Sequence, residues 1–346
     1  MYKRQYLDND PTSSTFGDII LDGTADVSEE LTVYNGYVKN SDVLLLQNSN
    51  FGFNFLPFSL NTSQEGRFLT NAPIVQYATK NDYGTLAMSA FGLLELAYIR
   101  FTYTKTDGTT IVEQVNRTFT NGAYTSATSN SRSVFIYIGC FPGNLRNWSG
   151  TFQALIAAET LVSYTVQCFN SSNQVLSESI KINLLCPNTK GYKPIRLTWL
   201  NQYGTWDYYT FNMKSSKMIS TKGSTYQQLE GSWNDLTYKV DSFRGGKKAF
   251  RVNATEKITM NTDFVNESET AWFEELINSP EVFILNGYDA SEAAFSTGSI
   301  NALLNTYVIP VRLTTSSYTR KTVANDKIMQ YTFEVEKSKT LRTQSV

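Results

Sequence analysis

The sequence predicts a mainly β protein, with two or more antiparallel β-sandwich or barrel domains and a single α-helix flanking the C-terminal one. Tyr and Phe number 21 each, and aromatic and β-branched residues suit the pleated, half-buried surface of a strand. Short apolar runs recur along the chain between Ser, Asn, Gly and Pro, which is the pattern of strands joined by turns. Apolar residues make up 41% of the chain and charged residues only 18%, a balance that supplies a core and argues against global disorder.

Residues 1–187 form the predicted N-terminal β domain, and a further split of this domain near residue 65 stays open. Strands are expected at residues 18–22, 41–47, 133–139, 163–169 and 179–185. In the last of these strands every second residue is apolar, so one face is expected to be buried. Asn170-Ser-Ser-Asn173 predicts the hairpin turn before that strand, and residues 151–162 are expected to contain one helix.

Two prolines and a glycine interrupt the strand pattern between Cys186 and Pro194, which predicts a domain boundary. Residues 188–346 form the predicted C-terminal β-sandwich or barrel. Its strands are expected at residues 195–200, 209–213, 249–252, 257–260, 307–313 and 329–336. The last strand alternates apolar and polar residues, as a strand does when one face meets the core and the other meets water.

One helix is predicted in the C-terminal domain, at residues 267–278. Asn266 can cap its first turn and Glu269 stands at the third helical position, which together make a capping box. Pro280 bounds its far end. Its large apolar residues share one face, namely Trp272, Phe273, Leu276 and Ile277. The helix is therefore expected to pack on a sheet.

The chain contains no histidine. Triads of the Ser-His-Asp and Cys-His types, histidine general bases and His-containing zinc sites are therefore excluded. Carboxylate pairs remain, but Glu274 and Glu275 are adjacent and point about 100° apart on a helix. Glu267 and Glu269 fit first-turn positions that stabilise the helix dipole. We therefore expect no enzyme activity, no catalytic residues and no cofactor.

The three cysteines, Cys140, Cys168 and Cys186, give no sign of a metal site. Their spacing contains no Cys-x-x-Cys motif, and three ligands without histidine make a poor zinc site. Each lies in or beside an apolar run, so free buried thiols are expected.

The charge balance bears on partners. A formal net charge of −1 argues against a nucleic-acid binder, which needs a basic face, and the basic stretch Arg244-Gly-Gly-Lys-Lys248 is interpreted as a charged hairpin tip. No apolar run approaches the ~20 residues of a membrane-spanning helix. No apolar stretch follows Lys3 and Arg4, so no signal peptide is expected and assembly in a cytoplasm is predicted.

The densest aromatic stretch contains five candidate hairpin or interface residues: Trp199, Tyr203, Trp206, Tyr208 and Tyr209. The pattern predicts a strand, a tight turn around Gly204 and a returning strand, with Asn201 and Asp207 bonding the turn backbone. Two interpretations stay open. The rings either pack within the hairpin and core as cross-strand pairs, or form a platform that stacks sugar rings or a partner surface.

A series of short motifs runs through the second half of the chain. The first set is Tyr164-Thr-Val166, Ser177-Glu178, Cys186, Trp199-Leu-Asn201, Gly204, Asp207 and Thr210-Phe211. The second set is Asn261-Thr-Asp263, Ser279-Pro-Glu-Val282, Ile309-Pro-Val311 and Asn325-Asp-Lys327. Together they resemble structural proteins of the tail hub and neck ring of tailed bacteriophages that infect Bacteroidota-type hosts, in the crAss-like style. Thr205 departs from the pattern, since a second glycine is common there.

This resemblance implies a non-catalytic virion protein, assembled in the host cytoplasm as a ring-forming subunit that connects portal, tail and adhesion parts. The implied partners are copies of itself, in rings for which six- or twelve-fold symmetry is usual, and other tail, portal or neck proteins. Specific nucleic-acid binding and membrane insertion are not expected. The alternative is a carbohydrate- or receptor-binding module of a phage or bacterial surface, suggested by the aromatic stretch.

Overall fold

A computed structural model describes residues 5–7, 19–21, 58–60, 65–91, 96–116, 133–185, 192, 194–232, 236–240, 242–285, 308–315, 317, 319 and 329–339. Of these residues, 53% lie in strands and 13% in helices, which confirms the mainly β class. The chain divides into two compact units, Met1–Tyr34 and Asn35–Val346. In the first unit β1 (Gln5–Leu7) pairs antiparallel with β2 (Ile19–Leu21). The strand expected at 41–47 lies outside the described residues.

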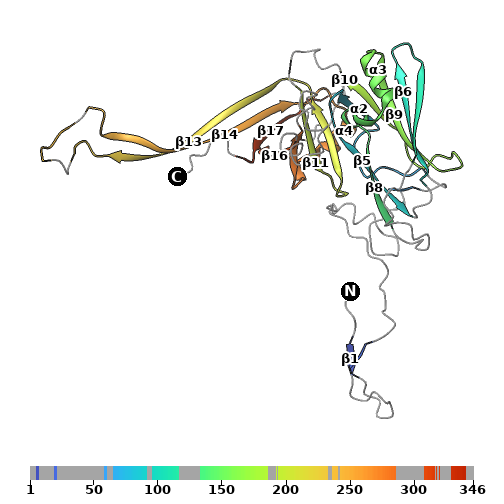
Figure 1. The fold of residues 1–346 in the computed structure, drawn as a ribbon, viewed down its shortest axis with the longest axis horizontal. Coiled ribbons are helices and arrows are strands. Elements are labelled where there is room, and N and C mark those ends of the chain that lie inside the picture. The colour runs from blue at the N-terminus through green and yellow to red at the C-terminus, as the bar shows by residue number, and fades with distance from the viewer. Residues whose placement is uncertain are drawn as a thin grey trace. The chain divides into compact units, whose positions relative to one another are not determined.

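The second unit contains a five-stranded sheet in the order β4-β10-β9-β6-β7 (Figure 1). Its strands are β4 (Val75–Thr79), β6 (Tyr98–Lys105), β7 (Thr110–Asn116), β9 (Leu161–Phe169) and β10 (Ile180–Leu185). β4 and β10 run parallel, whereas the other neighbours are antiparallel. The parallel pair departs from the purely antiparallel prediction, because a long crossover rather than a hairpin joins these two strands.

A three-stranded sheet and two short helices belong to the same half of this unit. The sheet has the order β3-β5-β8, with β3 (Ser59–Leu60), β5 (Thr85–Phe91) and β8 (Ser133–Gly139). β3 pairs parallel with β5, and β5 pairs antiparallel with β8. The helices are α2 (Pro142–Trp148) and α3 (Gly150–Ala157). Ser149 accepts a hydrogen bond from the backbone of Phe152 and so caps α3.

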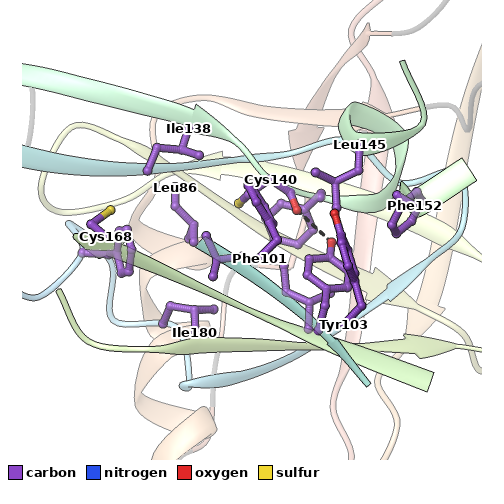
Figure 2. Packing of buried hydrophobic residues seen from close by; sticks show 14 of the residues in the cluster. Leu86, Phe101, Tyr103, Ile138, Cys140, Leu145, Phe152, Cys168 and Ile180 are labelled. Atoms are coloured by element: carbon purple, nitrogen blue, oxygen red, sulfur yellow. Dashed lines mark hydrogen bonds between the residues drawn. The ribbon is translucent and has the colours of Figure 1, made fainter. Parts of the chain in front are cut away.

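The first hydrophobic core draws side chains from both of these sheets and both helices (Figure 2). Phe101 and Tyr103 on β6 lie opposite Val166 and Tyr164 on β9. The side chains of these alternate residues therefore point to the same face of the sheet and into one core. The Tyr164 hydroxyl donates to the carbonyl oxygen of Cys140 at 2.8 Å. This bond satisfies the only polar group of a ring that is otherwise packed among apolar atoms.

The thiols of Cys140 and Cys168 are free and buried, as expected from the sequence. Burial raises the pKa of the Cys168 thiol to about 12 and raises that of Cys140 further. Both thiols therefore stay protonated and unreactive at neutral pH. Cys186 lies outside the described residues.

A seven-stranded antiparallel sheet has the order β12-β11-β15-β16-β17-β14-β13. Its strands are β11 (Ile195–Leu200), β12 (Trp206–Phe211), β13 (Ser215–Gln228), β14 (Gly246–Asn261), β15 (Val282–Leu285), β16 (Val308–Leu313) and β17 (Thr332–Lys337). The predicted half-buried closing strand is confirmed, since Phe333 and Val335 on β17 are buried and Glu334 and Glu336 are not.

Helix α4 (Glu267–Asn278) has the predicted bounds and the predicted capping box between Asn266 and Glu269. Trp272 and Phe273 from its inner face pack with strand residues of the seven-stranded sheet in a second hydrophobic core. The predicted packing of one helix on a C-terminal sheet is therefore confirmed.

Three elements differ from the prediction. The strands expected at 249–252 and 257–260 are parts of the single strand β14, and its partner β13 was not predicted. The helix expected within 151–162 ends at Ala157, and α2 precedes it. Strands β3 to β10 form the five- and three-stranded sheets, whereas strands from β11 onward form the seven-stranded sheet, all within the second compact unit.

Candidate functional site

The predicted aromatic hairpin is present as β11 and β12. Gly204 has a φ of +76°, a left-handed conformation that glycine adopts without strain. The side-chain oxygen of Asn201 accepts hydrogen bonds from the backbone of Tyr203 and of Thr205, both at 3.0 Å. Asn201 therefore closes the turn as predicted.

Two of the five candidate aromatic residues are buried. Trp199 is 0% exposed, and its ring centroid lies 5.0 Å from that of Trp272. The Tyr203 hydroxyl donates to Asn71 at 2.9 Å, while its ring packs on Phe58 with a centroid distance of 4.8 Å. Neither ring presents a face on which a sugar could stack, so both serve packing between segments that are distant in sequence.

The other three candidates are half-buried, and each contacts another ring. The ring centroid of Trp206 lies 5.6 Å from that of Phe283, and the ring centroid of Tyr208 lies 5.4 Å from that of Phe141. Tyr209 packs at 4.8 Å on Phe211 and at 4.9 Å on Phe273. The structure thus distributes the five rings among separate contacts and does not bring them together as one platform.

Asp207 has a different role from the predicted one. Its carboxylate accepts side-chain hydrogen bonds from Thr70 at 2.6 Å, from Asn201 at 3.0 Å and from the indole nitrogen of Trp272 at 2.6 Å. Burial raises the pKa of Asp207 to about 6, against these stabilising hydrogen bonds. The residue therefore joins the segment around Thr70, the hairpin and helix α4, rather than bonding the turn backbone.

A buried ion pair joins the two halves of the unit at a second place. The Arg196 guanidinium lies 3.4 Å from the Asp82 carboxylate, and both side chains are almost fully buried. The Thr210 hydroxyl donates to Asp82 at 2.7 Å. The guanidinium also lies over the rings of Phe141 and Tyr208, at 4.6 and 5.1 Å from their centroids. These contacts hold β11 and β12 against the first core.

The most exposed regular structure is the hairpin of β13 and β14, which we call the ribbon and define as residues 215–256. The two strands pair from Ser215↔Met260 to Gln228↔Gly246. β17 covers β14 only from Lys257 to Asn261. Beyond that point the two strands pair only with each other among the described residues, and Figure 1 shows them running away from the rest of the sheet.

The ribbon carries many exposed apolar side chains. Of the 18 large hydrophobic residues that are exposed in the described part of the chain, half lie in the ribbon: Met218, Ile219, Tyr226, Leu229, Leu236, Tyr238, Val240, Phe243 and Phe250. Ile219 is 60% exposed and Phe250 is 56% exposed. Single exposed apolar residues are ordinary, but a concentration of them on one element marks an interaction surface.

The two faces of the ribbon differ in chemistry. The pairing places Ile219 and Val252 on the face that continues toward the buried Ile258. This face also carries Lys217, Lys247 and Glu256, and we call it the mixed face. Lys222, Lys248 and Arg251 share the opposite face, which we call the cationic face. A two-stranded element with two distinct faces can contact partners on both sides.

Glu256 anchors the ribbon where it leaves the sheet. Its carboxylate lies 2.9 Å from the Lys337 amine and 3.7 Å from the Lys217 amine. The hydrogen bond from Lys337 holds the pKa of Glu256 below its usual range. The ribbon is thus tied to β17 at its base.

The sequence analysis missed the ribbon as a candidate site. Residues 215–228 are mostly Ser, Thr, Lys and Gln, and neither face of this segment is uniformly apolar, so the usual strand signal is weak. The signal that was present is Gly245-Gly246, where both residues have positive φ. The basic stretch that contains them lies at the start of β14, and antiparallel pairing continues beyond it at Gly231↔Val240. Its predicted position at a hairpin tip is therefore wrong.

Among the described residues, no group of three or more His, Cys, Asp or Glu side chains is placed to hold a metal ion. Within the same part of the chain, no helix has the length and apolar character needed to cross a membrane. No protein-family model matches the chain, and no curated protein matches it.

Proposed function

We propose that this chain is a non-catalytic structural subunit that assembles with copies of itself. The observation that carries the proposal is the ribbon, a long exposed element with apolar side chains along it. A two-stranded hairpin without further support is marginally stable in water. A ribbon of this length therefore gains stability when a partner covers it, and the proposed partner is another subunit.

The size of the ribbon suits a stable interface. The 14 residues of β13 span roughly 45 Å, and two strands are about 10 Å wide, so one face offers about 450 Å². A standard interface buries about 800 Å² per partner. Contacts on both faces of the ribbon would therefore reach the area of a standard interface.

Buried polar contacts between distant segments support the proposal that the rest of the subunit is rigid. Asp207 and the Arg196–Asp82 pair join elements from both halves of the second unit through short side-chain contacts. A structural subunit must keep its conformation when neighbouring subunits bind its projecting hairpin. Buried hydrogen bonds and ion pairs between distant segments contribute to such rigidity.

We place the subunit in a phage particle, as a ring-forming protein of the tail hub or neck that connects portal, tail and adhesion parts. This placement rests on the motif resemblance in the second half of the chain. The same resemblance implies a location in the virion and assembly in the host cytoplasm. It also implies other tail, portal or neck proteins as further partners.

The experiment that tests the proposal measures self-association of the purified chain by sedimentation velocity and mass photometry, with electron microscopy of the assembled fraction. The expected result is closed rings, or a series of oligomers whose masses are multiples of the subunit mass. A chain that stays monomeric at all accessible concentrations would contradict self-assembly. Mass spectrometry of purified virions tests the phage placement separately.

A further inference from the structure

Charge is unevenly distributed around the ribbon. Residues 215–256 contain seven Lys and Arg but four Asp and Glu. The segment that follows, residues 258–285, contains six Asp and Glu and no Lys or Arg; we call it the acidic segment, and it includes α4 and β15. A chain with a net charge of −1 thus places a basic element next to an acidic one.

Three cations of the ribbon make no ion pair within the described part of the same chain. Lys222, Lys248 and Arg251 form no ion pair with a described carboxylate. The Lys248 amine donates to the carbonyl oxygen of Phe243, and the Arg251 guanidinium donates to Asn253, so their contacts stay within the ribbon. Every residue of β13 between its first and last is exposed. The cationic face therefore has room for a partner along its whole length.

The acidic segment offers a complementary surface outside the ribbon. Glu281 is exposed and follows α4, while Phe264, 63% exposed, precedes it. Asp263 and Glu274 are half-buried along the same segment. Acidic side chains beside an exposed aromatic ring match a ribbon that carries cations and aromatic rings, since opposite charges steer association and apolar contacts hold it.

We infer that the ribbon of one copy docks on a second copy of this chain, with its cationic face toward the acidic segment. This inference rests on the proposed self-assembly and names the surfaces that meet. The ribbon and the acidic segment are different parts of the chain, so the contact is heterologous. A heterologous contact repeats from copy to copy and produces a ring where the rotation closes.

Charge reversal tests the contact in the full chain. Lys222→Glu, Lys248→Glu and Arg251→Glu combined are expected to weaken self-association at least tenfold in Kd, because three attractions become repulsions. The matched control is Lys80→Glu, Lys105→Glu and Lys181→Glu, which makes the same change of charge away from the ribbon and leaves association as in the parent. Circular dichroism confirms that both variants are folded.

A charge swap gives the sharper readout. Glu274→Lys with Glu281→Lys is expected to weaken assembly as well, and mixing this variant with the ribbon variant is expected to restore it. In the mixture each ribbon finds a segment of opposite charge on the other variant. Restored assembly on mixing cannot arise from a general loss of folding.

The outcomes separate the two proposals. A parent chain that assembles while the ribbon variant assembles equally well overturns the docking surface and leaves the proposed function standing. A parent chain that never assembles overturns both. Absence of rescue on mixing, or a parent ribbon that binds DNA or anionic vesicles instead of a second copy, also overturns the inference.

Discussion

Asp207 shows at the residue scale how a polar side chain can organise a largely apolar structure. It takes three hydrogen bonds from three segments, and one partner, Thr70, is 137 residues away in sequence. Burial of its carboxylate is nevertheless unfavourable, and this raises its pKa to about 6. The folded state therefore holds a proton on Asp207 more tightly than the unfolded state does.

The stability contributed by this proton has a definite pH window. It is fully present below the usual pKa of about 4 and is lost as the pH rises through about 6. We expect the free energy of unfolding to be about 1 kcal/mol larger at pH 5 than at pH 7 from this group alone. Asp207→Asn is expected to remove this difference. Urea unfolding of parent and variant at both pH values measures it, and parallel pH dependence in the two proteins would contradict the assignment.

The Arg196–Asp82 pair leads to a second prediction. Asp82→Ala leaves the buried guanidinium without its counter-charge, which is expected to cost about 3–5 kcal/mol of stability. Adding Arg196→Met is expected to recover part of that loss, since no buried charge then remains. Chemical unfolding of the two single variants and the double variant gives the coupling energy. Additive effects of the two changes would show that the pair is not coupled.

The sequence allowed some of these residue roles to be predicted and not others. Asn201 bonds the turn that surrounds it, so its role depends on neighbours two and four residues away. Asp207 depends on Thr70 and Trp272, which only the folded arrangement brings together. Likewise the aromatic stretch was recognised as a hairpin, but the partners of its rings lie on β8–α2, α4 and β15.

At the scale of elements, the same division between local and distant causes holds. Helix α4 was predicted with its correct bounds because its capping box and apolar stripe are local in sequence. β13 was missed because its polar residues take their structure from pairing with β14. Strand pairing depends on tertiary context more than helix formation does.

Substitutions in the ribbon are expected to weaken assembly without lowering the stability of the subunit. Ile219→Ser and Phe250→Ser together are expected to reduce self-association about tenfold or more, because they remove apolar contact area. Both residues are exposed in the isolated chain, so the melting temperature should change by only a degree or two. Val112→Ser on β7, where Val112 is 53% exposed, is the control. Equal loss of association in the control would contradict a specific role of the ribbon.

At the scale of the whole molecule, the predicted boundary at residue 188 separates two cores that are nevertheless joined. Phe101 belongs to the first core, whereas Trp199 and Trp272 belong to the second. The side-chain contacts of Asp82 and Thr70 link the halves across this boundary. Whether the halves unfold together is therefore a measurable property of the junction.

We expect the two cores to unfold in one transition. Phe101→Ala removes a fully buried ring and is expected to cost about 3–5 kcal/mol. Trp148 packs on Phe101, so the measurement uses a Trp148→Phe background. If the junction couples the halves, the remaining tryptophan fluorescence shifts to a lower urea midpoint by the same amount as circular dichroism. A fluorescence midpoint that stays at the parent value would show that the halves unfold independently.

The irregularity in the ribbon has a consequence for its two sides. The pairing shifts between Ser224↔Arg251 and Thr225↔Ala249, so Phe250 is an extra residue in β14 that has no paired residue on β13. In an unbroken alternation Lys248 would stand opposite Gln227 and turn away from Arg251. Because Phe250 has no partner, Lys248 pairs with Tyr226 instead of Gln227. Lys248 therefore stays on the same face as Lys222. Inserting one residue between Ser224 and Thr225 would give Phe250 a partner on β13. The regular alternation that results would move Lys248 to the reverse surface of the two strands with almost no change in composition.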